Sequence, residues 1–249
     1  MTINPYYTER RTVRVYKNCP VSDKIISDIA EAASHAPSTG NMQLYSLVVT
    51  RDKDNLAKLT PCHFNQPAST NAPVILTFCA DLNRFEHWCR INNAKPGFEN
   101  LQSLMSAILD VTIFAQQFVT IAEQNGLGCC YLGTTTYNAE EIANALDLPD
   151  RVIPIISLSL GYPDDDATKT PRLPVDAFLH FEKYNRHSDD IINNLYKVIE
   201  EQPDNARYIA ENDKDNLAQV FTDVRYPRSN NELFSDKFID YIRRQQFMK

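Results

Sequence analysis

Apolar residues recur at helical spacing in two long stretches of the chain. Between residues 22 and 36 they fall on one face of a predicted helix, with Ser22 at its N-cap position and Pro37 just beyond its end. From residue 102 to 125 the apolar face is broader, which predicts a long helix in the core of the domain, ended by the glycines of the sequence NGLG.

Four shorter stretches have the composition of β-strands. Their ranges are 44–52, 72–83, 129–134 and 151–163. The second is apolar throughout, so we expect it to be buried on both faces of a sheet. Pro154 lies within the fourth and predicts an irregularity in strand pairing. Before the fourth strand, Asn138 and Glu141 form a capping pattern that predicts a short helix ending before Pro149.

The residue composition of the chain changes after Pro163. A polar, proline-bearing loop is followed by charged helical segments with modest apolar stripes, at residues 189–201, 215–224 and 231–247. We therefore divide the chain into a core at residues 1–186 and a helical C-terminal extension at 187–249. The stripes must be buried, either against the same core or against a partner subunit, and the pattern leaves both open.

Composition and charge narrow the classes of function. The chain has 249 residues, with 25 basic and 32 acidic side chains and a formal net charge of −7. This balance argues against a nucleic-acid partner, which requires a basic face. The N-terminal residues are polar, so we expect no signal peptide, and the apolar run at 152–160 is too short to cross a bilayer. We expect a cytoplasmic protein without a membrane partner.

The six cysteines form no CxxC pair and no Cys/His cluster at ligand spacing, so the sequence predicts no metal site. Cys129 and Cys130 are adjacent. A position in a buried strand and a redox role are both compatible with that pair, and the behaviour of cysteine as a small hydrophobic residue favours the buried strand.

Three arginines, Arg10, Arg11 and Arg14, fall within five positions around Thr12. In an extended segment Arg10, Thr12 and Arg14 would share a face, and in a helical turn Arg11 and Arg14 would. Either arrangement suits a phosphate group, because guanidinium donors bind phosphate oxygens in pairs and stay charged at any pH. The alternatives are a solvated basic segment, or arginines paired with Glu9 and its neighbours.

A second polar stretch follows the first predicted helix, at residues 35–45. It supplies hydroxyl, amide and open backbone groups suited to a polar ring system, from Ser38, Thr39, Gly40, Asn41 and Gln43. The chain contains only 6 glycines and neither a P-loop signature nor a GxGxxG sequence. Anion binding must therefore rely on side chains, which makes the arginine cluster more significant.

Four motifs in this order resemble one family. They are RRTVRVY (10–16), HAPSTGNMQ (35–43), NGLGCCYLG (125–133) and SLGYP with KTPRLP (159–174). Together they resemble the FMN-dependent nitroreductase family, and within it the NADPH-dependent branch of oxygen-insensitive nitroreductases and flavin reductases. The resemblance runs from about residue 5 to 180.

The resemblance implies an α+β fold with a mainly antiparallel sheet flanked by helices, in an intertwined homodimer with a helical C-terminal arm. It implies two FMN sites at the subunit interface and no catalytic side chain, because the chemistry takes place at the flavin N5 atom. The implied contacts are Arg10, Arg11, Thr12 and Arg14 for the phosphate and ring edge; Gln66, Tyr131, Leu132 and Gly133 for the isoalloxazine; Lys169 and Arg172 for the phosphate and ribityl chain; and Ser38, Thr39, Gly40 and Gln43 from the other subunit.

The implied activity is two-electron transfer from NAD(P)H through FMN to nitroaromatics, quinones or free flavin, by a ping-pong mechanism. The alternatives are a flavin reductase that supplies reduced FMN to a partner, a reductive dehalogenase, and a flavin-binding protein without turnover. NADPH is expected as the donor, with NADH as the alternative because the arm is acidic at its start. A loop at residues 87–102 is a candidate cover for the ring, with Trp88 and Phe98 as candidates to influence acceptor choice.

Overall fold

A computed structural model describes residues 3–164 and 167–248, in two compact units. The first unit contains the chain up to Thr168 together with the segment from Phe234 onward, and the second contains Lys169–Leu233. The sequence boundary placed at residues 186 and 187 lies within the second unit. All strands and the core helices belong to the first unit.

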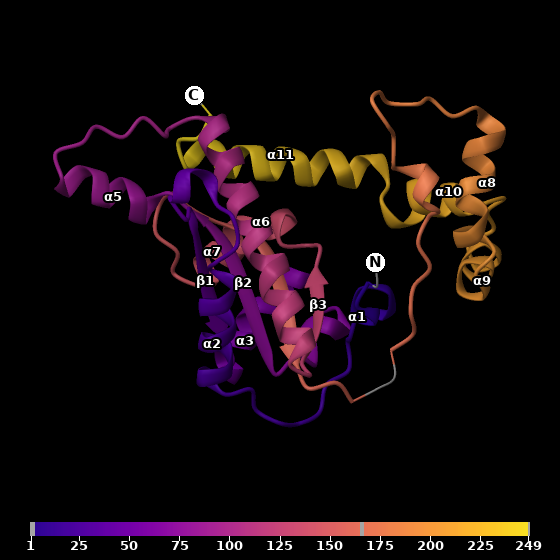
Figure 1. Cartoon of the computed structure of the whole chain (residues 1–249), viewed down its shortest axis with the longest axis horizontal. Helices are drawn as coiled ribbons and strands as arrows, with labels where there is room; N and C mark the ends of the chain where they lie inside the picture. The colour runs from indigo at the N-terminus through magenta and orange to yellow at the C-terminus, as the bar shows by residue number, and fades with distance from the viewer. Residues whose placement is uncertain (1–2, 165–166, 249) are drawn as a thin grey trace. The chain divides into compact units, whose positions relative to one another are not determined.

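The first unit is built on a sheet of four strands, counted within the described residues, in the order β1-β2-β4-β3 (Figure 1). All three pairings are antiparallel, which confirms the predicted sheet. The strands are β1 (Tyr45–Thr50), β2 (Val74–Asp81), β3 (Gly128–Leu132) and β4 (Val152–Gly161). β1 and β3 therefore form opposite edges, and this order determines where the predicted site residues can meet.

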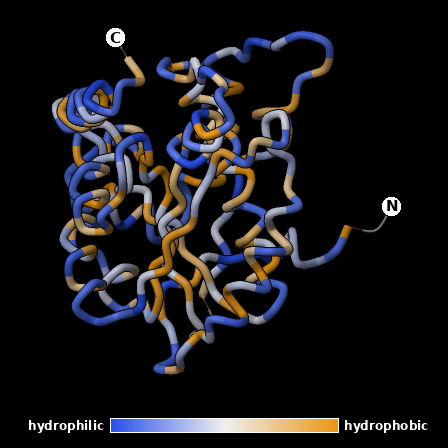
Figure 2. The backbone as a smooth tube through the Cα atoms, turned by 90° about the vertical axis from the view of Figure 1, so that its left-hand side faces the viewer, coloured by the Kyte–Doolittle hydropathy of each residue, from blue (hydrophilic) through white to orange (hydrophobic). Residues whose placement is uncertain are grey.

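Both faces of the sheet are covered by helices. Every residue of β2 is buried, as predicted. Alternate residues such as Leu76 and Phe78 pack in the cluster that contains α2 (Asp23–Ala33) and α6 (Leu101–Gln124). Ile75 points to the other face. There it joins a smaller cluster with residues of α3 (Lys53–Leu59) and α7 (Ala139–Ala145). Figure 2 shows the hydrophobic stretches of the tube concentrated along the central strands.

The proline in β4 produces the predicted irregularity. Phe78 pairs with Ile156, whereas the next residue of β2, Cys79, pairs with Pro154. Ile155 is thus an extra residue on β4, a β-bulge that accommodates a residue without a backbone N–H group. The prediction from Pro154 is confirmed.

Helix α6 is the central helix of the first unit. It is long and apolar enough to cross a membrane by length and composition alone. Nine of its residues are buried, and they pack against the sheet and α2, so it is the core helix that the sequence predicts. The Asn100 side chain caps it by accepting from the Ser103 amide at 2.9 Å. Ser22 caps α2 in the same way, as predicted, at 3.3 Å from the Ile25 amide.

The predicted cap of α7 is wrong in its bonding. Asn138 occupies the N-cap position but makes no side-chain capping bond. Its Nδ2 atom donates to the Cys62 carbonyl at 2.7 Å, and its Oδ1 atom accepts from Lys237 Nζ at 2.8 Å. The asparagine therefore joins distant segments. The predicted loop at 87–102 also begins too early, because its first residues belong to α5 (Asn83–Ile91).

The second unit is helical, as expected from its stripes. It contains α8 (Asp189–Glu200), α9 (Pro203–Glu211), α10 (Leu217–Gln219), a π-helical turn η5 (Val220–Arg225) and the start of α11 (Arg228–Arg244). Leu217 and Val220 are its buried residues among those described. The remaining short turns are η1 (Thr39–Asn41), η2 (Pro61–His63), η3 (Thr136–Asn138) and η4 (Val175–Ala177).

Candidate functional site

The arginine-rich segment follows α1 (Pro5–Glu9) and lies along the β3 edge of the sheet. The Val13 amide donates to the Cys129 carbonyl oxygen at 3.1 Å, and the Lys17 amide donates to the Tyr162 carbonyl at 2.8 Å. Along the segment Val13 is buried, whereas the next residue, Arg14, is exposed. The segment is therefore extended, which decides between the two backbone arrangements that the sequence left open.

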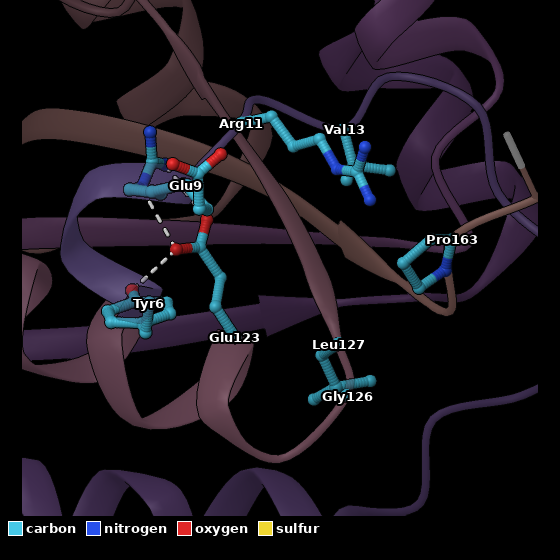
Figure 3. A pocket seen from close by; sticks show the side chains of 9 residues that line it. Tyr6, Glu9, Arg11, Val13, Glu123, Gly126, Leu127 and Pro163 are labelled. Atoms are coloured by element: carbon cyan, nitrogen blue, oxygen red, sulfur yellow. Dashed lines mark hydrogen bonds and ion pairs between the residues drawn. The ribbon is translucent and has the colours of Figure 1, made fainter. Parts of the chain in front are cut away.

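Arg10 is bound to a carboxylate of α6. Its Nη2 atom lies 2.9 Å from Glu123 Oε1, and its Nε atom donates to Oε2 at 2.9 Å. The Tyr6 hydroxyl also donates to Oε2, at 2.6 Å, and Figure 3 shows Tyr6 and Glu123 meeting in this way. Burial raises the pKa of Tyr6, and the hydrogen bond to Glu123 raises it further. The Tyr6 hydroxyl therefore keeps its hydrogen and stays a donor at neutral pH. This pairing is the alternative that the sequence left open for the cluster, realised at Arg10.

A cavity of about 290 Å³ lies beside this group (Figure 3). Its lining consists of Tyr6, Glu9, Arg10, Arg11, Val13, Glu123, Gly126, Leu127 and Pro163. Two arginines and two glutamates face the same space, so their formal charges balance. Arg11 donates from Nη1 to the Ala167 carbonyl at 3.3 Å.

Arg14 does not line this cavity and lies next to Cys130 of β3. Its guanidinium group interacts with Cys130, whose pKa is raised by burial and lowered in part by Arg14. Burial also raises the pKa of the neighbouring Cys129 thiol. Neither thiol is a reactive thiolate at neutral pH, which agrees with the buried-strand interpretation of the pair.

Tyr131, Leu132 and Gly133, the residues predicted to contact the isoalloxazine ring, lie where β3 ends. Tyr131 is 36% exposed and Leu132 is buried against Cys130. Cys129 directs its carbonyl away from β4 to the Val13 amide, and alternate residues of a strand face the same way. The backbone amide of Tyr131 therefore faces the side of the arginine-rich segment. A Cβ atom at Gly133 would meet nothing within 4 Å, so the backbone is open there.

Gln66 comes to the same place from α4 (Pro67–Thr70), whose N-cap position it occupies. Its Nε2 atom donates to the Thr134 hydroxyl oxygen at 3.5 Å. The same oxygen lies 3.0 Å from Nδ1 of His63, a fully buried histidine whose pKa burial lowers to about 4. Arg14, Gln66 and the residues of β3 thus form one group at this edge.

The second predicted group is at the other edge of the sheet, before β1. The Thr39 amide and hydroxyl donate to Asp110 Oδ1 at 2.7 and 2.8 Å, and the Leu44 amide donates to Oδ2 at 3.3 Å. Gly40 has φ +55°, in the left-handed region that favours glycine. Gln43 is fixed through its carbonyl, which accepts from Arg84 Nη2. Through Thr39 and Leu44, Asp110 thus anchors to α6 the segment that contains Ser38, Gly40 and Gln43.

The two groups lie far apart within one chain. The Ser38 group precedes β1 and the Arg14 group lies at β3, and the strands β2 and β4 separate these two edges. With neighbouring strands about 4.8 Å apart, the two edges are about 14 Å from each other. A single chain therefore does not bring its own Ser38 group to the Arg14 group.

The remaining predicted residues are placed as follows. Lys169 and Arg172 belong to the second unit, where Arg172 is exposed and donates to the Thr170 carbonyl at 3.3 Å. Trp88 is 58% exposed and contacts the Phe85 ring, with centroids 5.6 Å apart. Phe98 contacts the same Phe85 ring, with centroids 5.5 Å apart. The two aromatic side chains are therefore neighbours in the first unit.

Three residues that position the site were not found from the sequence. Asp110 and His63 are buried and Glu123 is half-buried, and each bonds a partner far away in the chain. For the two acids a signal was present, because a carboxylate on the apolar face of a core helix requires a partner. For His63 the sequence offers no comparable signal.

Alanine in place of Gly128 is expected to displace the arginine-rich segment. Its Cβ atom would lie 2.6 Å from Val13 Cβ, a contact that neither backbone can relieve without moving. We expect a loss of about 1–3 kcal/mol in the free energy of unfolding, measured by urea denaturation. Gly133→Ala is the matched control, with no atom within 4 Å of the new carbon. Equal stability of the two variants would contradict the close packing of Val13 on β3.

Known proteins share this sequence and fold. The model of the nitroreductase family matches residues 7–162. FMN reductase [NAD(P)H] of Bacillus subtilis is 32% identical over 196 residues, 78% of each chain. Cr(VI) reductase of Pseudomonas sp. strain G-1 is 31% identical over 174 residues, 70% of this chain and 72% of that one.

A solved structure from Bacteroides fragilis NCTC 9343 is 45% identical with a TM-score of 0.97, and the match covers 99% of this chain and 100% of that one. The family match includes the arginine-rich segment, the Asp110-anchored group and β3, and it agrees with the antiparallel sheet. The chain belongs to the nitroreductase family.

Proposed function

We propose that the chain is an FMN-dependent oxidoreductase that passes two electrons from NAD(P)H to nitroaromatics, quinones or free flavin. Membership of the nitroreductase family supports this, as do relatives named FMN reductase and Cr(VI) reductase. The observation that carries it is the group at the β3 edge. There an exposed arginine, an amide side chain and open backbone from distant parts of the chain lie together.

The residues of this group fit FMN. Arg14 supplies a guanidinium donor for the phosphate. The contacts implied for Arg10, Arg11, Thr12, Lys169 and Arg172 stay predictions, because Arg10 is bound to Glu123 and Arg11 to the Ala167 carbonyl in this structure. Gln66 and the backbone of Tyr131, Leu132 and Gly133 supply donors and open space for the polar edge of the ring. FMN, when bound, supplies the hydride chemistry itself. The side chains bind and orient it, and their donors stabilise the negative charge that the ring gains on reduction.

The group of Ser38, Thr39, Gly40 and Gln43 can contribute to the flavin site only from a second subunit, so the proposed site is that of a homodimer. Ser38, Thr39, Gly40 and Gln43 complete the site in the other subunit, because the two groups lie at opposite edges of the sheet in one chain. The solvent side of α6 supports self-association. Four apolar side chains at every fourth position are 41–56% exposed there, namely Leu101, Met105, Leu109 and Ile113. The helical C-terminal segment is proposed as a dimer arm, and the enzyme as cytoplasmic, without nucleic acid or membrane partners.

Anaerobic reduction tests this function. The purified protein should be yellow, and NADPH added under argon should bleach the flavin band within seconds. NADH in a parallel sample determines the preferred donor. Bleaching followed by reoxidation with a nitroaromatic or quinone, in two separate half-reactions, is expected for a ping-pong mechanism. A protein that binds no FMN, or bound FMN that neither nucleotide reduces, would refute the proposal.

A flavin reductase is the second candidate function, and the name of the B. subtilis relative favours it. The two functions differ in the acceptor. Rapid reduction of excess free FMN, with release of reduced flavin, indicates a flavin reductase. Reduction of a quinone or nitroaromatic while the flavin stays bound indicates the first function.

A further inference from the structure

A buried histidine lies beneath the candidate flavin site. His63 is fully buried, and burial keeps its imidazole neutral at physiological pH. Its Nδ1 atom is 3.0 Å from Thr134 Oγ1, and its Nε2 atom is buried without a hydrogen-bond partner in the described residues. Thr134 directly follows Gly133, one position beyond the residues predicted to contact the ring.

The hydrogen-bond pattern determines the tautomer. A neutral imidazole has one N–H donor and one bare nitrogen. A buried N–H group without a partner is rarer than an incompletely satisfied acceptor, so the unpartnered Nε2 is the bare nitrogen. Nδ1 therefore carries the hydrogen and donates it to Thr134 Oγ1. Gln66 Nε2 donates to the same oxygen at 3.5 Å.

This pattern leaves the hydroxyl hydrogen of Thr134 without a hydrogen-bond acceptor in the described residues. A hydroxyl oxygen has two acceptor positions and one hydrogen. His63 and Gln66 occupy both acceptor positions, so the hydroxyl hydrogen points away from them, with no acceptor among the described residues. The Tyr137 amide holds the Thr134 carbonyl at 3.1 Å, which fixes the backbone of this turn.

We propose that Thr134 donates its hydroxyl hydrogen to an acceptor atom of the FMN ring, and that His63 is the positioning residue that sets its direction. This inference rests on the proposed function. The acceptor atoms of the ring gain negative charge on reduction, so a hydroxyl donor binds reduced flavin more strongly than oxidised flavin. The pair His63–Thr134 thus raises the reduction potential of the bound flavin.

Dye-coupled redox titration of the holoenzyme tests the proposal. Thr134→Val keeps the shape of the side chain and removes its hydrogen. It should weaken the preference for reduced over oxidised FMN about tenfold, a potential lower by about 30 mV for two electrons. Thr134→Ser keeps the hydroxyl and should retain the wild-type potential. Thr136→Val, two residues away, is the matched control and should also retain it.

His63→Leu tests the positioning role. It should lower the potential as Thr134→Val does, and the double variant should fall no further than either one, because the two residues act as a unit. If His63→Leu does not fold, the three threonine variants still decide the first part of the proposal. A wild-type potential in Thr134→Val, or a lowered one in Thr134→Ser, would overturn it. Absence of bound FMN from the wild-type protein would instead refute the proposed function, and this inference with it.

Discussion

Replacing Arg14 by alanine is expected to weaken FMN binding about 100-fold, equivalent to the loss of a charge-assisted contact to phosphate. The reason lies in how the arginines are used. Arg10 is held by Glu123, whereas Arg14 is exposed beside β3. The dissociation constant can be measured by quenching of FMN fluorescence on titration of the apoprotein.

Two variants serve as controls for this result. Lys17→Ala removes another exposed positive charge from the same segment, and it should leave FMN affinity within about twofold of wild type. Arg10→Gln should mainly lower stability, because it leaves Glu123, whose side chain is only 8% exposed, without its ion pair. If Lys17→Ala weakens binding as much as Arg14→Ala, general electrostatic attraction would explain the effect and the phosphate contact would be refuted.

The core of the fold could be predicted from the sequence because its signals are local. The apolar face of α6, the continuous apolar run of β2 and the Ser22 cap each lie within one short stretch. The same holds for Pro154, since a missing N–H group disturbs strand pairing in any surroundings. Each of these predictions is confirmed in the structure.

The support of the candidate site could not be predicted in the same way because its contacts are distant in sequence. Asp110 bonds Thr39, 71 residues away, and Glu123 bonds Arg10, 113 residues away. Asn138 shows the converse: its local pattern predicted a cap, but the carbonyl of Cys62, 76 residues earlier, takes its donor instead. Tertiary contacts outweigh a local preference of this size. The arginines show both the local and the distant kind of signal. Their clustering is visible in the sequence, but the pairing of Arg10 with Glu123 and the position of Arg14 beside β3 depend on distant residues.

Heterodimers that carry different defects should recover flavin sites, if each site is shared between two chains. One chain carries Arg14→Ala, and the other carries Ser38→Ala with Gln43→Ala. In their heterodimer both defects fall in one site and the other site is intact, so about half of the wild-type FMN content is expected. Each parent homodimer should bind little FMN. Co-expression with two affinity tags yields the heterodimer, and the absorbance of bound flavin measures its content.

The reciprocal heterodimer decides between shared and single-chain sites. Here one chain carries all three substitutions and its partner is wild type. Shared sites would each receive one defect, so FMN content should fall to the level of the parent homodimers. Sites contained in one chain would reverse both results: about half the FMN in this heterodimer and almost none in the first. The two preparations contain the same substitutions in the same number, so stability and net charge are matched and only their distribution between the chains differs. A result of this reversed kind would refute the role proposed for the Asp110-anchored group in the second subunit, while leaving the arginine contact to phosphate in place.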